Sequence, residues 1–383
     1  MRRALLSIGL MLVATTGLIA AGCGSSSDAG ATTRAAAGVV GAPALDGIVA
    51  AAQSGRGGKP DLLRCGAAGS ASCDANNGAM GPVRSMQVSD GKLLVGVFTG
   101  ELLTCDPDRA VSCDAIGKIP GITAIAADAA AAKDATPSVY VGTNGGFDGG
   151  SSGDIWRCPQ ATAGGACRNV GTPRPNAYVA SLVLAKGTLY AGLDDGRILS
   201  CTTGGASLSL CTTFARAGSG VLSVDSNGTT RVFAGTDAGA VLSCPLAGPS
   251  RGRCTTVTTV PGAQVRSVAA LPGANTVYAG LSLDAPDADG KVGRLLRCDA
   301  SCTPIALPAP PPAPADSPIE AAESAVTAVV PSAAGIWVGQ GTVTAQRAQG
   351  VISLCPADGS TPCAVQWSDP QYGVTAMTGV PAQ

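Results

Sequence analysis

The residues best able to do chemistry in this sequence are its cysteines. Cys23 stands alone near the N-terminus, and the other 14 of the 15 cysteines lie in seven neighbouring pairs. The pairs are Cys65 and Cys73, Cys105 and Cys113, Cys158 and Cys167, Cys201 and Cys211, Cys244 and Cys254, Cys298 and Cys302, and Cys355 and Cys363. Only Cys298 and Cys302 have the spacing of metal ligands or of a redox pair, but the chain has no histidine and no second dithiol lies near them. We therefore expect structural disulfides in all seven pairs.

The absence of histidine also restricts catalysis. It removes the commonest general base and the commonest transition-metal ligand, and it excludes Ser-His-Asp and Cys-His chemistry. Among the carboxylates, Asp284, Asp287 and Asp289 resemble part of a calcium loop, but Ala285 stands where such a loop needs a carboxylate and no bidentate Glu follows. We expect solvated turn residues here, with calcium as a minor alternative, and hence no metal site and no cofactor.

The cysteine pairs mark a repeat. Their first members recur every 40 to 57 residues, and in six copies a glycine stands five residues before that cysteine. Upstream lies an apolar segment with an aromatic residue and a glycine, as in Val139-Tyr140-Val141-Gly142, and before it another apolar segment, such as residues 83–88. A fourth segment starts at or beyond the second cysteine of each pair. These patterns predict four short strands per copy, with the repeated aromatics packed in the core rather than stacked on a ligand.

Four antiparallel strands in a unit of about 40 to 45 residues are typical of a propeller blade. The mature chain resembles β-propeller repeat proteins, although it lacks the Trp-Asp and double-glycine signatures of named repeat classes. The resemblance implies an all-β fold, a seven-bladed β-propeller with four antiparallel strands per blade. We number the blades one to seven after their cysteine pairs, and we expect each disulfide to join the third strand to the fourth.

The two ends of the repeat predict how the ring closes. The first copy opens at Ile48 with a second strand and has no first strand before it. The chain ends with residues 374–380, which match the missing first strand. We therefore predict that the C-terminal strand completes blade one, which removes the open sheet edge that would otherwise favour aggregation.

The N-terminal residues have the pattern of an export signal. Met1-Arg2-Arg3 is a positive n-region, and residues 4–21 are uncharged and apolar. The segment Leu18-Ile19-Ala20-Ala21-Gly22-Cys23 resembles the lipobox of bacterial lipoproteins, with Ala20 where leucine is usual. The resemblance implies a signal peptide at 1–22, a lipid on Cys23, a flexible tether at 23–45 and the propeller at 46–383. An uncleaved transmembrane anchor and a simple secretory signal are the alternatives.

The long loops indicate where a partner would bind. Connections between the second and third strands are long in blades six and seven and intermediate in blade one, and a proline-rich crossing enters blade seven on the same face. We expect a binding rim there, and the competing interpretation is neutral insertions. Its candidate residues are Asp284, Asp287, Asp289, Pro311, Gln340 and Arg347. Arg84 and Arg266 occupy equivalent positions in first strands, and they would line the central channel as an anion site or as ordinary solvated charges.

The net charge and the export signal narrow the functions that we expect. The net charge is −1 and the longest basic run is Arg2-Arg3, so we expect no nucleic-acid partner. The leading hypothesis is a non-catalytic binding or scaffold lipoprotein of the bacterial cell envelope, held on the membrane by the Cys23 lipid and facing an envelope protein or polysaccharide. Gly24 after the lipidated cysteine favours the outer membrane in a Gram-negative host. The alternative is a propeller enzyme, either a glycosidase-like hydrolase with paired carboxylates or a quinone-cofactor dehydrogenase, although Trp156, Trp337 and Trp367 are all expected to be packed.

Overall fold

The computed structural model describes residues 41–54, 61–66, 73–76, 81–108, 113–128, 137–145, 153–160, 166–173, 176–203, 211–288, 292–309, 325–344 and 347–382. The strands within these ranges number 28 and form seven antiparallel sheets of four strands each. In the same ranges no helix is long and apolar enough to cross a membrane. Cys23, the signal segment 1–22 and most of the tether lie outside the described residues.

Each sheet is one blade, and its strands follow one another outward from the centre. Blade one is β28 (Tyr372–Pro381), β1 (Leu45–Ser54), β2 (Asp61–Gly66) and β3 (Cys73–Asn76). Blade two is β4 (Val83–Ser89), β5 (Lys92–Val97), β6 (Glu101–Cys105) and β7 (Cys113–Lys118), and blade three is β8 (Ile122–Asp128), β9 (Ser138–Thr143), β10 (Ile155–Pro159) and β11 (Arg168–Gly171). Blade four is β12 (Val179–Ala185), β13 (Thr188–Leu193), β14 (Arg197–Thr202) and β15 (Thr212–Arg216), and blade five is β16 (Val221–Ser226), β17 (Arg231–Thr236), β18 (Ala240–Pro245) and β19 (Thr255–Thr259). Blade six is β20 (Ala263–Ala270), β21 (Val277–Leu283), β22 (Gly293–Cys298) and β23 (Cys302–Ile305), and blade seven is β24 (Ala325–Ser332), β25 (Gly335–Thr344), β26 (Arg347–Cys355) and β27 (Ala364–Asp369).

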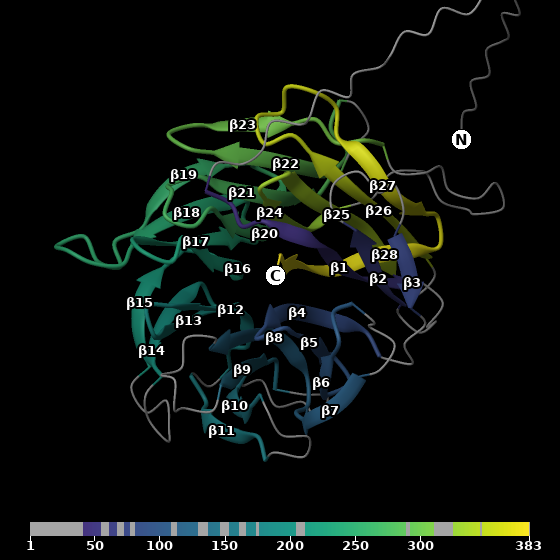
Figure 1. The fold of residues 1–383 in the computed structure, drawn as a ribbon. Coiled ribbons are helices and arrows are strands. Elements are labelled where there is room, and N and C mark those ends of the chain that lie inside the picture. The colour runs from purple at the N-terminus through teal and green to yellow at the C-terminus, as the bar shows by residue number, and fades with distance from the viewer. Residues whose placement is uncertain are drawn as a thin grey trace, which may run out of the picture. The chain divides into compact units, whose positions relative to one another are not determined.

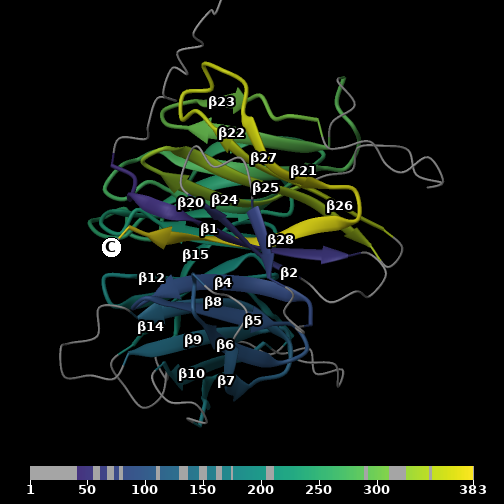
Figure 2. The ribbon, with the colours of Figure 1, turned by 45° about the vertical axis from the view of Figure 1, so that its right-hand side comes forward.

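The innermost strands form a closed ring around a central channel. Each of them contacts the innermost strand of the next blade, and β28 contacts both β24 and β4 (Figure 1). The C-terminal strand pairs antiparallel with β1, with Ala50 opposite Met377 and Ala51 opposite Ala376. These two strands, from the two ends of the chain, lie side by side in both views (Figure 2). The predicted seven-bladed propeller, closed by the C-terminal strand, is confirmed.

All seven predicted disulfides are present. In every blade the bond links the third strand to the start of the fourth, and the paired Cα atoms are 4.0 to 4.2 Å apart. The outer strands are short and partly exposed, so a covalent link at this hairpin stabilises the part of the blade that buries least apolar surface.

The space between blades is filled by a repeated fit between a glycine and a branched residue. A Cβ atom added to Gly280 would lie 2.4 Å from Cγ1 of Val326, the second residue of the innermost strand of the next blade, and Gly142 faces Val179 in the same way at 2.5 Å. Side chains are absent here because the neighbouring blade occupies the space. The five aromatic residues of the repeat are buried beside these contacts, as expected: Tyr140, Tyr190, Phe233, Tyr278 and Trp337.

One predicted loop is instead a strand extension. The sequence suggested a long loop between the second and third strands of blade seven, but β25 and β26 stay paired from Ile336 opposite Cys355 out to Thr344 opposite Arg347. Thr342, Val343 and Thr344 are β-branched and favour extended backbone, so the hairpin continues beyond the blade.

Candidate binding site at the channel mouth

A β-bulge recurs at the same place in every innermost strand. In β4, Val83 faces Val97 and Ser85 faces Gly96, so Arg84 is an extra residue in the pairing. A bulge leaves its extra residue unpaired and re-aims its side chain. Register shifts at the equivalent positions give seven bulge residues. They are Arg84, Thr123, Ala180, Leu222, Arg266, Thr327 and Thr375.

Four of these bulge residues form one polar arc. Because β28 lies between β24 and β4, the ring order places Arg84, Thr375, Thr327 and Arg266 on consecutive blades two, one, seven and six. We call these four residues the arginine arc. The bulge residues on the remaining three blades are Thr123, Ala180 and Leu222, so both charged bulge residues, Arg84 and Arg266, belong to the arc.

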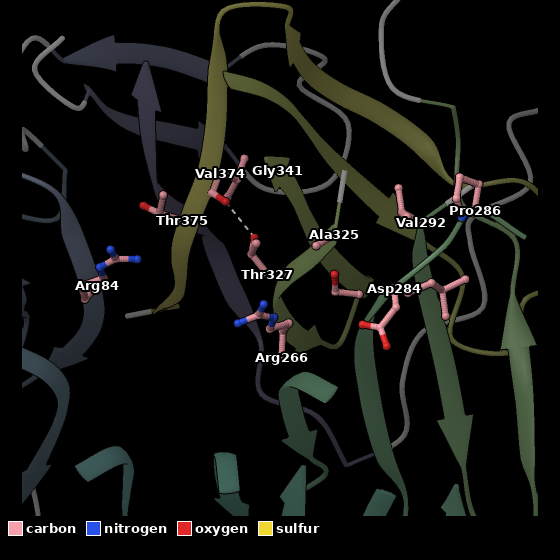
Figure 3. Close-up of a pocket in the computed structure, with 12 residues that line it drawn as sticks. Arg84, Arg266, Asp284, Pro286, Val292, Ala325, Thr327, Gly341, Val374 and Thr375 are labelled. Atoms are coloured by element: carbon pink, nitrogen blue, oxygen red, sulfur yellow. Dashed lines mark hydrogen bonds between the residues drawn. The ribbon is translucent and has the colours of Figure 1, made fainter. Parts of the chain in front are cut away.

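The arginine arc lines a cavity of about 520 Å³ at the mouth of the channel. The connection that follows β21 in blade six contributes Asp284 and Pro286 to its wall. Figure 3 shows Arg84 and Arg266 entering this space from different sides, with Thr327 and Thr375 between them and Asp284 beyond Arg266. The volume lies within the range of small-molecule pockets, about 300 to 1,000 Å³.

The two arginines of the arc are exposed and have no ion pair with any described carboxylate. Arg84 lies over the ring of Phe98, with 5.1 Å from Cζ to the ring centroid. The protein around the cavity desolvates the Arg84 guanidinium and lowers its pKa. A guanidinium stacked on an aromatic ring keeps its N–H groups free for a ligand in the plane of the fork.

The threonines of the arc are already used as donors. Oγ1 of Thr327 donates to the carbonyl oxygen of Val374 at 2.8 Å (Figure 3). The same hydroxyl lies 3.2 Å from the carbonyl oxygen of Gly339, and Oγ1 of Thr375 donates to the carbonyl of Ala51 at 3.4 Å. These hydroxyls satisfy backbone carbonyls at the bulges. The side-chain donors left for a ligand are therefore those of the arginines.

An exposed tyrosine lies near the mouth. Tyr178, just before β12, is 37% exposed, and its backbone N–H donates to Oδ1 of Asp194 at 2.8 Å. Partial burial and the charges of Asp194 and Asp237 raise the pKa of Tyr178, while the positive charge of Arg266 opposes them. The lining of the cavity itself does not include Tyr178, Asp194 or Asp237.

Deeper in the channel the wall also carries charge. The channel volume is about 1,090 Å³, and its lining includes Asp128, Lys186 and Asp225. Burial raises the pKa of Asp225 to about 6, although hydrogen bonds from the backbone N–H groups of Ala270 and Ser226 oppose that shift. Asp128 and Asp225 lie on β8 and β16, with β12 between them, and no hydrogen bond joins them among the described residues.

The other rim candidates do not join the cavity. Asp287 pairs with Arg294 at 3.2 Å. Gln340 is only 3% exposed, so it is not a surface residue, and its Oε1 has no partner among the described residues. Arg347 begins β26, but its side chain lies outside the description, as do Asp289 and Pro311 entirely. Of the six rim candidates, the structure places Asp284 together with the two channel arginines.

The three tryptophans pack against the core, as expected. Trp337 is buried, and Trp156 and Trp367 are partly buried against core clusters. In the part of the chain that the structure describes, no group of three or more Cys, Asp or Glu side chains could hold a metal ion.

The sequence patterns missed several residues of the site. Thr327 and Thr375 occupy the same repeat position as Arg84, two residues before the central apolar residue of each first strand. Aligning the seven first strands would have identified them, whereas nothing in the pattern indicated Phe98 or Tyr178.

Comparisons with known proteins support the fold alone. No protein-family model matches the sequence, and no curated protein is significantly similar to it. Among solved structures, the chain is similar to the crystal structure of the computationally designed Ika8 protein, with a TM-score of 0.50 and 15% sequence identity over 87% of this chain and 91% of that one. At this identity the likeness concerns architecture and carries nothing about function.

Proposed function

We propose that the protein is a non-catalytic binding or scaffold lipoprotein of the bacterial cell envelope, which engages its partner at the channel mouth. The observation that carries the proposal is the 520 Å³ cavity, because a closed ring holds its lining strands rigidly while the arc supplies arginines that form no ion pair with a described carboxylate. Pre-organised polar groups around a cavity are the usual design of a binding site.

An exported location is supported by the cysteines. Seven disulfides in one chain are typical of an oxidising compartment. The lipobox-like residues before Cys23 favour a lipid anchor, and the polar run after it favours a tether that holds the propeller away from the bilayer. In a Gram-negative host, we propose the outer membrane as its location.

Binding fits the channel better than hydrolysis does. A glycosidase-like hydrolase needs two carboxylates flanking one bond. The channel carboxylates Asp128 and Asp225 lie two blades apart, and one of them accepts a backbone hydrogen bond. The lining of the mouth cavity includes one described carboxylate, Asp284, together with two arginines.

A glycan partner fits the surface better than a protein partner. Stable protein interfaces centre on buried aromatic and large apolar anchors. The exposed large apolar side chains of the described residues are Tyr178, at 37%, and Val365, at 45%, which lie on different blades. A surface so poor in anchors, around a polar cavity, favours a hydroxyl-rich ligand.

Blocking the cavity tests the binding function. Ala325 lines the cavity at the start of β24, so Ala325→Trp should fill it while Ala325→Ser should leave it open. We expect the purified mature lipoprotein to bind the polysaccharide fraction of its own envelope, and Ala325→Trp to weaken that binding at least tenfold in a sedimentation assay. Equal binding by both variants, with unchanged melting temperatures, would place the partner elsewhere.

Lipidation is tested separately. Cys23→Ala should move the protein from the membrane fraction to the soluble exported fraction and abolish incorporation of a labelled fatty acid, whereas Ser25→Ala should retain both. Membrane association and labelling that survive Cys23→Ala would contradict the anchor without affecting the binding proposal.

A further inference from the structure

The arginine arc holds positive charge that the fold itself does not use. Ion pairs stabilise or orient several arginines elsewhere, such as Arg294 with Asp287. Arg84 and Arg266 have no such partner among the described residues, although both lie in a concave site where the protein displaces part of the surrounding water. Charges placed in such a cavity attract an anion more strongly than charges on an open surface.

The arc retains a positive balance even with its neighbouring acid. Two guanidinium groups and the Asp284 carboxylate give the described lining a net charge of +1. Each guanidinium offers a planar fork of N–H donors that matches the two oxygens of a carboxylate. The threonine hydroxyls already donate to backbone carbonyls, so the arginines provide the side-chain N–H donors of the arc.

The surroundings of Arg266 match a sugar better than a bare ion. Tyr178, which is 37% exposed just before β12, lies outside the lining of this cavity, and its ring offers an apolar face for the C–H groups of a pyranose that extends from the site. The Asp284 carboxylate of the lining is an acceptor, which suits a sugar hydroxyl. A cavity of about 520 Å³ that continues into the channel has room for a chain end of a few sugar residues.

We infer that the channel mouth binds a uronic acid residue of an acidic polysaccharide, with its carboxylate held between Arg84 and Arg266. This inference rests on the proposed function and names its ligand. The Arg84 guanidinium lies over the Phe98 ring, and the Arg266 guanidinium enters the cavity from a different side (Figure 3). The polysaccharide provides the carboxylate, and the β-bulges orient the side chains of Arg84 and Arg266.

Titration calorimetry with defined oligosaccharides tests the inference. The probe is trigalacturonic acid, with neutral galactotriose, free galacturonic acid and inorganic sulfate as comparisons. We expect the acidic trisaccharide to bind at least tenfold more tightly than the neutral one, and free galacturonic acid to bind more weakly because it makes fewer contacts. Binding should weaken as sodium chloride is raised.

Charge variants supply the matched controls. Arg84→Gln and Arg266→Gln should each weaken binding of the acidic trisaccharide at least tenfold, while Arg253→Gln, an exposed arginine in the connection between β18 and β19, should change it less than twofold. Asp284→Asn removes the one described carboxylate of the cavity and should tighten binding. Melting temperatures within a few degrees of the original protein show that each variant is folded.

Different failures have different meanings. If galactotriose binds as well as the acid and Ala325→Trp abolishes both, the binding function stands and the acidic assignment is wrong. If sulfate competes as strongly as the acidic trisaccharide, the site recognises a free oxyanion and the saccharide assignment is overturned. If neither the oligosaccharides nor the envelope polysaccharide fraction bind, the proposed function fails as well.

Discussion

Oδ2 of Asp225 accepts a hydrogen bond of 2.8 Å from the backbone N–H of Ala270, which lies on the innermost strand of the next blade. Oε1 of Gln87 in β4 likewise accepts a hydrogen bond of 2.8 Å from the backbone N–H of Ala127 in β8, at the boundary between blades two and three. Neighbouring innermost strands belong to different sheets, so side-chain acceptors of this kind connect them. At one boundary the acceptor is a carboxylate, and at the other it is a neutral amide.

The carboxylate makes stability depend on pH. Burial raises the folded-state pKa of Asp225 from the ordinary 3.8 to about 6. Between pH 3.8 and about pH 6, Asp225 is therefore protonated in the folded protein but ionised in the unfolded chain. The stability that the protonated side chain contributes is fully present below about pH 4, and it is lost as the pH rises through 6. The difference between the folded-state and unfolded-state pKa values corresponds to about 3 kcal/mol of unfolding free energy.

Asp225→Asn keeps an acceptor for Ala270 and cannot ionise. We expect its unfolding free energy to match that of the original protein at pH 4 and to exceed it by up to about 3 kcal/mol at pH 7.5, measured by urea unfolding. The reverse change, Gln87→Glu, should introduce a similar loss of stability on raising the pH. Parallel pH profiles for the original protein and Asp225→Asn would show that the carboxylate titrates as it does in the unfolded chain.

The glycine fit between blades predicts a rescue. A Cβ on Gly280 would meet Val326 at 2.4 Å, so Gly280→Ala should destabilise the protein by about 1 to 3 kcal/mol through overpacking. Combining it with Val326→Ala should recover part of that loss, which a double-mutant cycle by thermal unfolding would detect as a favourable coupling. Ala51 occupies the same repeat position in blade one and packs with Val83, so Ala51→Gly should destabilise rather than relieve strain. Additive effects of the first two changes would contradict the steric account.

The stability that each disulfide contributes should depend on the length of the loop that it closes. The Cys244–Cys254 bond closes a separation of 10 residues and the Cys298–Cys302 bond one of 4. Replacing both cysteines of the first pair by alanine should cost roughly 3 kcal/mol of unfolding free energy, and doing so in the second pair roughly 2 kcal/mol, in the chain-entropy model. Urea unfolding of the two variants measures this, and a larger loss for the shorter loop would point to packing around Cys298 instead.

The closing strand should be essential. Ending the chain after Tyr372 removes most of β28 and leaves the edge of β1 unpaired. We expect aggregation or a strongly lowered melting temperature by size-exclusion chromatography and calorimetry, because an exposed hydrophobic edge recruits other chains. Deleting only the last two residues, which follow β28, is the control. A truncated protein that melts like the intact one would show that the ring does not depend on this pairing.

The sequence by itself determined the repeat, the number of blades, the disulfide partners and the closing strand. Each of these follows from local patterns: paired cysteines 4 to 10 residues apart, a glycine before six of the seven third strands and a tail that matches a missing first strand. A repeat imposes the same local structure seven times, so its count can be read directly.

Only the tertiary structure decided what the site contains. Arg84 and Arg266 were placed in the channel from the sequence, but their aim depends on bulges, which arise from pairing with the second strand rather than from the first strand alone. Thr375 joins them because ring closure brings blades one and seven between blades two and six. Gln340 was expected on the rim and is buried, because β25 continues as a paired strand and its alternation turns that side chain inward.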